Sequence, residues 1–399
     1  MCTMVLLLAV DGAKKHKEKH VSDDDLKLEL GGLGVNGGSG RIDAWLVAQT
    51  TTECRIALTD RPSTFELDGK TFASAAAFDK QRGTKRAALC VVRRSEKTAT
   101  STLAMVSFSS DMSYVVSTPN NKNFALWPAL VERGAYADRW RLPHYLLVGT
   151  IEDRAPFKNA CPDAAKALLH VVKTLALLRV FLLKECGASG KPCAAALYAD
   201  MDTAPGLDAD PSRYLRLDPH ADFVVSSNIH KPILANSGVF LVTNTPGGRA
   251  LLRNWWGYRC ARHDQLALWK VLFDRWATVV PRLRDLPIFA SYALAHNRAM
   301  PELVAAREAT WPALRGAKWA CAPNSTCGRL LHAENCVSEP ISVGATLLVP
   351  MHPFAPGLPP LQGPGRKQAL FCHKVDCFEE STSDAGHPCG GSVWNGTFV

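Results

Sequence analysis

The chain has 399 residues, of which 47% are hydrophobic and 21% are charged, and its formal net charge is +9. This composition excludes a disordered or collagen-like chain, and the length suffices for one large domain with extensions. The basic residues are scattered and no nucleic-acid reader motif is present, so the charge predicts attraction to anionic ligands such as phosphates, and we expect no nucleic-acid partner.

The N-terminal part predicts a tail rather than a folded unit. Residues 1–40 end in the Gly-rich segment GGLGVNGGSG, which is typical of a flexible linker. The segment contains Gly32-x-Gly34-x-x-Gly37, the pattern of a dinucleotide-binding loop, but the run before it alternates like a half-exposed strand. A nicotinamide-dependent oxidoreductase is therefore a minor alternative.

From residue 100 onward, strand and helix patterns alternate. Buried strands are expected at 102–108, 144–151, 194–199, 221–227 and 238–242, and helices at 124–140, 162–187, 246–258 and 264–276. This alternation predicts an α/β fold with a mostly parallel sheet flanked by helices. We expect one domain at 100–378 with a Cys-rich C-terminal part, preceded by an unassigned extension at 41–99 and followed by a tail at 379–399.

The cysteines suggest an oxidising compartment. Six of the 13 lie in the C-terminal part, and their spacing matches no zinc knuckle, so disulfides are expected: Cys321, Cys327, Cys336, Cys372, Cys377 and Cys389. Glycosylation sequons at Asn324 and Asn395 point the same way. The apolar run from Met4 to Val10 is shorter than the roughly 20 residues of a membrane span and lacks the features of a signal peptide. We expect a secretory-pathway protein with no visible signal or membrane anchor.

Two aspartates, Asp200 and Asp202, directly follow the strand expected at 194–199. Ligands of open α/β sheets lie outside the carboxyl ends of the strands, and the period of two along a strand projects both carboxylates to the same side. Mg²⁺ and Mn²⁺ typically bind one or two carboxylates together with substrate phosphates. The pair predicts a divalent-cation site that stabilises a departing diphosphate, and a solvated turn is the alternative.

The order of five elements resembles a known family. A Lys-bearing helix, the D-x-D strand, an N-S-G-V-F strand, a tryptophan helix and a D-Q helix follow one another over roughly residues 100–280. In this order they resemble the GT-A fold nucleotide-diphospho-sugar transferases, in particular the fungal and plant α-galactosyl-, α-mannosyl- and xyloglucan xylosyltransferases. The resemblance implies a Golgi glycosyltransferase that needs Mn²⁺ or Mg²⁺ and moves a hexose or pentose from a nucleotide-diphosphate donor to a glycan or glycoprotein. A catalytically inactive GT-A protein that binds nucleotide-sugar or glycan is the alternative.

The resemblance also implies a metal site. Asp202 would ligate the metal directly, and Asp200 would contact the metal or the donor ribose. A histidine from the C-terminal part would complete the site. His373 in QALFCHK is favoured over the Pro-flanked His352, because its run resembles a short buried strand.

Donor and acceptor residues follow from the same resemblance. The donor-binding set is Ser107, Ser109, Lys173, Asp200, Ser237 and Gly238. The set nearest the reacting sugar is Asn236, Asp264 and Gln265. Retention of the anomeric configuration is expected, whereas an inverting reaction would use Asp264 as the base. For Lys173 an exposed surface position is an equal alternative, and Trp255 and Trp256 fit a helix core better than a sugar-stacking platform.

Overall fold

The computed structural model describes residues 5–6, 19–20, 43, 46–47, 50–59, 64–83, 87–117, 126–149, 167–205, 209–228, 231–257, 264–281, 284, 340–349 and 371–373. Among these, no helix is long and apolar enough to cross a membrane. The Gly-rich loop at residues 32–37, both sequons and His352 lie outside the described residues.

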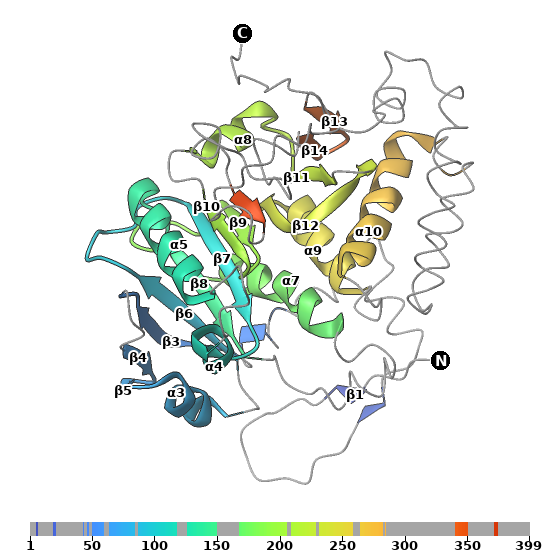
Figure 1. The fold of residues 1–399 in the computed structure, drawn as a ribbon. Coiled ribbons are helices and arrows are strands. Elements are labelled where there is room, and N and C mark those ends of the chain that lie inside the picture. The colour runs from blue at the N-terminus through green and yellow to red at the C-terminus, as the bar shows by residue number, and fades with distance from the viewer. Residues whose placement is uncertain are drawn as a thin grey trace, which may run out of the picture.

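An 11-stranded sheet runs through the described part of the chain (Figure 1). In spatial order its strands are β13 (Ile341–Val343), β14 (Thr346–Val349), β11 (Phe223–Asn228), β12 (Lys231–Thr243), β9 (Ala195–Ala199), β7 (Leu103–Ser109), β8 (His144–Val148), β6 (Ala87–Arg93), β3 (Thr50–Ala57), β4 (Thr64–Leu67) and β5 (Lys70–Phe72). Two further strand pairs are β1 (Val5–Leu6) with β2 (Lys19–His20), and β10 (Thr203–Pro205) with β15 (Phe371–His373).

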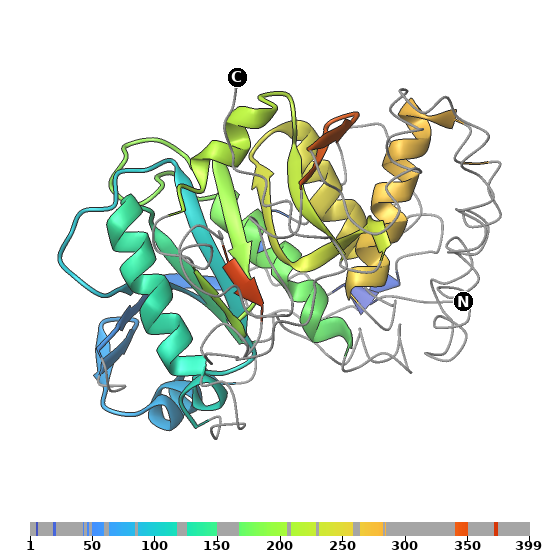
Figure 2. The same ribbon diagram turned by 45° about the horizontal axis from the view of Figure 1, so that its top comes forward.

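Helices cover both faces of the sheet (Figures 1 and 2). One face carries α7 (Ala167–Phe181), α9 (Pro246–Gly257) and α10 (Asp264–Val279), and the other carries α3 (Ala75–Arg82), α4 (Met112–Ser117), α5 (Leu126–Trp140) and α8 (Ser212–Leu217). Side chains along β7 alternate between the two faces of the sheet. Ala104 and Val106 pack with α7 on one face, and Met105 packs with Tyr136 of α5 on the other. The predicted α/β fold, with a large sheet between helices, is confirmed.

Parallel pairing occupies the centre of the sheet, and the flanks are more antiparallel than expected. Strands β7, β8 and β9 run parallel, whereas β12 is antiparallel to both β9 and β11. The reason is the connection: β11 ends at Asn228 and β12 begins at Lys231, which is too short for the crossover that parallel neighbours need. Because β12 runs back along β9, its residues 236–238 lie beside the carboxyl end of β9.

The segment at 50–93 belongs to the same sheet. It contributes β3, β4, β5 and β6, and β6 pairs with β8 of the segment after residue 100. Helix α3 is part of the connection along the chain from β3 to β6, which pair in parallel. Ser74 caps the N-terminus of this helix by accepting a hydrogen bond from the Ala77 amide. The unassigned extension therefore enlarges the central sheet.

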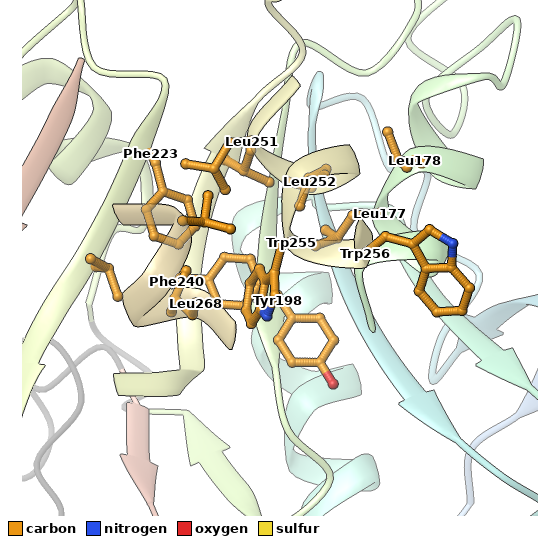
Figure 3. Close-up of a cluster of buried hydrophobic side chains, with 14 of the residues drawn as sticks. Leu177, Leu178, Tyr198, Phe223, Phe240, Leu251, Leu252, Trp255, Trp256 and Leu268 are labelled. Carbon is orange, nitrogen blue, oxygen red and sulfur yellow. The ribbon is translucent and has the colours of Figure 1, made fainter. Parts of the chain in front are cut away.

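The aromatic core lies between the sheet and helices α7, α9 and α10 (Figure 3). The ring of Phe240 on β12 is stacked on Tyr198 of β9 at 5.1 Å between centroids and is 5.4 Å from Trp255 of α9. Trp255 is fully buried and Trp256 is 5% exposed, so the prediction that both belong to the core is confirmed.

The end of α7 differs from the expectation. The helix ends at Phe181, and Gly187, expected to close it, lies in the following loop with a φ of +58°. A Cβ at Gly187 would lie 2.8 Å from the Ala99 carbonyl oxygen, so this close approach explains the glycine. The expected start at Pro162 lies outside the described residues.

Two disulfides stabilise the described part of the chain. Cys54–Cys90 joins β3 to β6, and Cys186–Cys193 closes the loop between α7 and β9. Of the six C-terminal cysteines for which disulfides were expected, Cys372 forms part of β15 and the other five lie outside the described residues.

Candidate functional site

A cavity of about 750 Å³ opens at the carboxyl end of β9. Apolar, hydroxyl-bearing and charged side chains form its wall: Phe108, Ser109, Ser110, Tyr114, Leu126, Lys173, Tyr198, Asp200, Met201 and Asp202. Ligand pockets typically measure about 300–1,000 Å³ and combine apolar surface with a few polar groups. The cavity therefore has the size and the mixed lining of a site for a small organic molecule.

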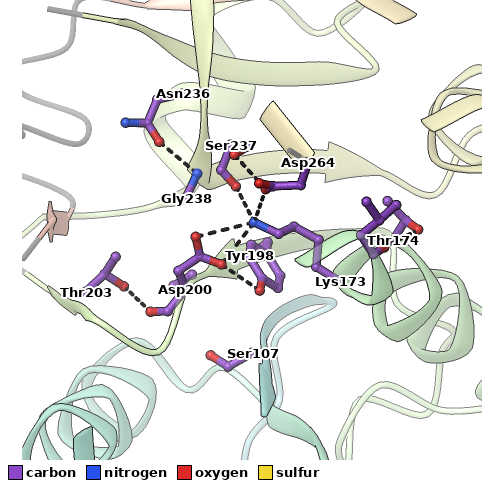
Figure 4. Close-up of polar contacts among 12 residues, drawn as sticks. Ser107, Lys173, Thr174, Tyr198, Asp200, Thr203, Asn236, Ser237, Gly238 and Asp264 are labelled. Atoms are coloured by element: carbon purple, nitrogen blue, oxygen red, sulfur yellow. Dashed lines mark hydrogen bonds and ion pairs between the residues drawn. The ribbon is translucent and has the colours of Figure 1, made fainter. Parts of the chain in front are cut away.

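A buried lysine connects three segments at this cavity (Figure 4). The Lys173 Nζ on α7 lies 3.0 Å from Asp200 Oδ1 and 2.8 Å from Asp264 Oδ2, and it donates a 2.9 Å hydrogen bond to the Ser237 carbonyl oxygen. The Tyr198 hydroxyl donates to the same Asp200 oxygen at 2.8 Å. The Lys173 side chain is 1% exposed, so the alternative of a surface lysine is wrong.

Burial and opposite charges act on this network in opposite directions. Burial lowers the pKa of Lys173, but the carboxylates of Asp200 and Asp264 outweigh burial, and the net effect raises the pKa. The pKa of Asp200 is raised, mainly by burial. The charge of Lys173 lowers this pKa, and the charges of Asp264 and Asp202 raise it. Burial, followed by the charge of Asp200, raises the pKa of Tyr198 well above its usual range, so this hydroxyl remains a donor.

The residues beside Asp200 come from β12 and α10. The Asp200 amide donates to the Gly238 carbonyl oxygen at 2.8 Å, and the Asn236 side chain accepts a 2.7 Å bond from the Gly238 amide. The Ser237 hydroxyl donates to Asp264 Oδ2 at 2.8 Å. Ser237 and Gly238, predicted to bind the donor, and Asn236, predicted near the reacting sugar, thus lie within one hydrogen-bonded group with Asp200 and Asp264.

The start of α10 is anchored to the core. The indole Nε1 of Trp255 donates to the Asp264 carbonyl oxygen at 2.9 Å, which fixes the first residue of the helix. The Asp264 side chain is 6% exposed. Gln265 follows in the first turn and is partly exposed.

The backbone brings the predicted metal-ligand positions close to the turn after β9. Asp200 and Asp202 both line the cavity, and the backbone of His373 in β15 is paired with Thr203, the residue after Asp202. Within the described residues no group of three or more His, Cys, Asp or Glu side chains is arranged to hold a metal ion. Two carboxylates on one cavity wall nevertheless match the number that Mg²⁺ and Mn²⁺ take from proteins when phosphates complete the coordination shell.

The two serines predicted at the end of β7 have different surroundings. Ser109 lines the cavity, and its hydroxyl donates to the Asp111 carbonyl oxygen at 2.8 Å. Ser107 is fully buried and is not among the lining residues, because its hydroxyl accepts a 2.8 Å bond from Arg133 of α5. The sequence reasoning missed Arg133 and Tyr198, and the signal for Arg133 was a charge on the apolar face of a helix.

Comparisons with known proteins add little to this site. No protein-family model and no curated protein matches the chain. One solved structure, "Crystal structure of a glycosyltransferase involved in the glycosylation of the major capsid of PBCV-1", is similar over 43% of this chain and 76% of that one, with 13% identity and a TM-score of 0.30. A likeness this weak carries no argument, so a functional proposal has to rest on the site itself.

Proposed function

We propose that this chain is a glycosyltransferase that moves a sugar from a nucleotide-diphosphate donor to a glycan or glycoprotein acceptor with retention of configuration. The observation that carries the proposal is convergence: residues from β9, α7, β12 and α10 meet in one network at the wall of a cavity large enough for a nucleotide. These are the elements whose order in the sequence resembles the GT-A family.

A divalent cation, Mn²⁺ or Mg²⁺, would be held by Asp202 and Asp200 and, when bound, would supply positive charge to the diphosphate of the donor. Lys173 and Tyr198 both donate to the same oxygen of Asp200 and thereby fix the orientation of this carboxylate. Asn236 and Gly238, joined by a hydrogen bond and adjacent to Asp200, would contact the donor sugar.

The surroundings of Asp264 support retention. A general base must be able to take a proton from the attacking hydroxyl. The Asp264 carboxylate is buried, and its Oδ2 accepts a hydrogen bond from Ser237 and is paired with the ammonium of Lys173, so partners inside the protein already occupy the oxygen that a base would use. Its proposed role is to hold Lys173 and the start of α10 beside the reacting sugar, with Gln265 toward the acceptor.

The proposed location is the lumen of the secretory pathway, in the Golgi. Two disulfides in the described part support this location, since disulfides persist in oxidising compartments.

The test compares the wild type with Asp202→Asn, which removes one carboxylate charge with little change in shape. We expect the wild type to be stabilised by a nucleotide-sugar with Mn²⁺ in a thermal-shift screen and to transfer or hydrolyse that donor, and Asp202→Asn to lose metal-dependent turnover while remaining folded. Asp274→Asn is the matched control, because Asp274 lies on α10 in an ion pair with Lys270 and does not line the cavity.

Two outcomes would contradict the proposal. Undiminished turnover in Asp202→Asn would exclude this site as the catalytic centre. Binding of nucleotide-sugar by the wild type without transfer or hydrolysis would favour the inactive binding protein. Proton NMR of the anomeric product separates retention from inversion.

A further inference from the structure

A fully buried arginine lies beneath the turn that carries the two aspartates. The guanidinium of Arg133 on α5 donates to the carbonyl oxygens of three consecutive residues: Ala199 at 3.3 Å, Asp200 at 3.1 Å and Met201 at 2.7 Å. It also donates to the Ser107 hydroxyl at 2.8 Å and to the Ala129 carbonyl oxygen at 3.3 Å. One planar group therefore joins the end of β7, the end of β9 and the turn that follows β9.

This arginine is charged without a direct carboxylate partner. All of its hydrogen bonds within the described residues go to neutral oxygens. Burial lowers the pKa of Arg133 to about 10, so the group keeps its proton at neutral pH. A buried charge is costly unless its surroundings compensate for it, and here backbone carbonyl dipoles and the nearby Asp200 and Asp202 do so.

Helix α5 also contacts the chain further along, at Ala209. Tyr136, almost one turn after Arg133, donates a 2.8 Å hydrogen bond to the Ala209 carbonyl oxygen. Near the carboxyl end of β9, the Thr203 hydroxyl and amide bond the Asp200 carbonyl oxygen at 2.7 Å and 3.1 Å. The backbone that carries Asp200 and Asp202 is thus held from below by α5 and across the turn by Thr203.

We infer that Arg133 is a positioning residue for the site, which holds the turn from Asp200 to Asp202 in the conformation that presents both carboxylates to the cavity. The inference rests on the proposed function, because it assigns this turn to binding of a metal–diphosphate. Lysine cannot replace the arginine, because an ammonium is a point donor and cannot span the hydroxyl of β7 and three carbonyls at once. Residues that orient metal ligands typically change metal affinity about 10–100-fold when they are mutated.

The experiment measures binding of Mn²⁺ alone, and of Mn²⁺ with UDP or GDP, to the full chain by titration calorimetry and by the Mn²⁺ resonance signal. Arg133→Met and Arg133→Lys should both weaken Mn²⁺ binding about 10–100-fold, with thermal unfolding recorded alongside. Arg179→Met is the matched control, since Arg179 is 7% exposed on α7, binds the Thr50 hydroxyl and does not line the cavity. We expect it to lower the melting temperature without changing Mn²⁺ affinity.

The outcomes separate the two hypotheses. Equal Mn²⁺ affinity in the wild type and in the Arg133 variants, with a lower melting temperature alone, would overturn the inference and leave the proposed function standing. Failure of the wild type to bind Mn²⁺ with either nucleotide would overturn the proposed function and this inference with it. If the Arg133 variants do not fold, Ser107→Ala, which removes one anchor of the guanidinium, should weaken Mn²⁺ binding in the same direction, and unchanged affinity there would refute the role.

Discussion

Replacing Lys173 with Met should destabilise the fold strongly, and the loss should depend on pH. The change keeps most of the side-chain volume and removes the ammonium that contacts Asp200, Asp264 and the Ser237 carbonyl oxygen. Breaking a buried ion pair by removing one partner costs about 3–5 kcal/mol, because a buried charge is left uncompensated. The uncompensated charge would lie on Asp200 and Asp264, whose side chains are 27% and 6% exposed.

The pH dependence distinguishes loss of charge from loss of packing. Without the ammonium, the folded-state pKa of Asp200, already raised by burial, rises further above its unfolded value. A carboxyl group with a raised folded-state pKa favours the folded form as the pH falls through that value. The stability difference between wild type and Lys173→Met should therefore shrink between pH 8 and pH 5, whereas a packing defect would give the same difference at both pH values.

The assay is urea denaturation of both proteins at pH 8 and pH 5. The control is Lys270→Met, because Lys270 pairs with Asp274 one turn along α10 in a more exposed position, where such pairs contribute about 0.3–0.5 kcal/mol. The double variant Lys173→Met with Asp264→Asn should regain part of the lost stability. A loss below about 1 kcal/mol, or one that is equal at both pH values, would refute the assignment of Lys173 as the counter-ion.

Three further predictions concern the rest of the fold. Burial, aided by Arg133, lowers the pKa of His144 to about 3. Below pH 6.5 the unfolded chain therefore binds more protons than the folded chain, and the free energy of unfolding decreases as the pH falls. His144→Leu should remove about 2 kcal/mol of this decrease between pH 7.5 and pH 5 in denaturation curves. By loop-closure entropy, replacing Cys54 and Cys90 with Ala should cost about 4 kcal/mol and replacing Cys186 and Cys193 about 2.5 kcal/mol, so equal losses would contradict this ranking. Gly187→Ala should lower the melting temperature, because the residue has a φ of +58° and its Cβ would meet the Ala99 carbonyl oxygen, whereas Gly190→Ala, with open space around it, should lower it less.

The local elements could be predicted because each has a pattern of its own. The apolar runs at 102–108 and 194–199 became β7 and β9, and the helix expected at 264–276 became α10, which extends to Val279. These runs are continuous because both faces of a central strand are covered. The position of Asp200 at the end of such a strand was enough to place it at the carboxyl edge of the sheet, where it lines the cavity.

Strand direction could not be predicted in the same way. The apolar part of β12 suggested another parallel strand, but the strand begins seven residues earlier, at Lys231, and forms a hairpin with β11. Pairing depends on where a strand begins and on its partner, and neither is encoded in the apolar run alone. The antiparallel direction brings Ser237 and Gly238 beside Asp200.

Lys173 and Arg133 show why one site residue was found from the sequence and the other was missed. Both are charged residues on the buried faces of helices, and a buried charge must find compensating groups. Lys173 was predicted from the resemblance of its helix to the family's Lys-bearing helix, and its partners include the carboxylates of Asp200 and Asp264. Arg133 binds mainly backbone carbonyls, and every residue type at those positions provides the same carbonyl oxygen, so no side-chain pattern marks the partner. It follows that a substitution of the Met201 side chain should leave the contact with Arg133 intact, whereas loss of the guanidinium should release the turn whatever residues occupy it.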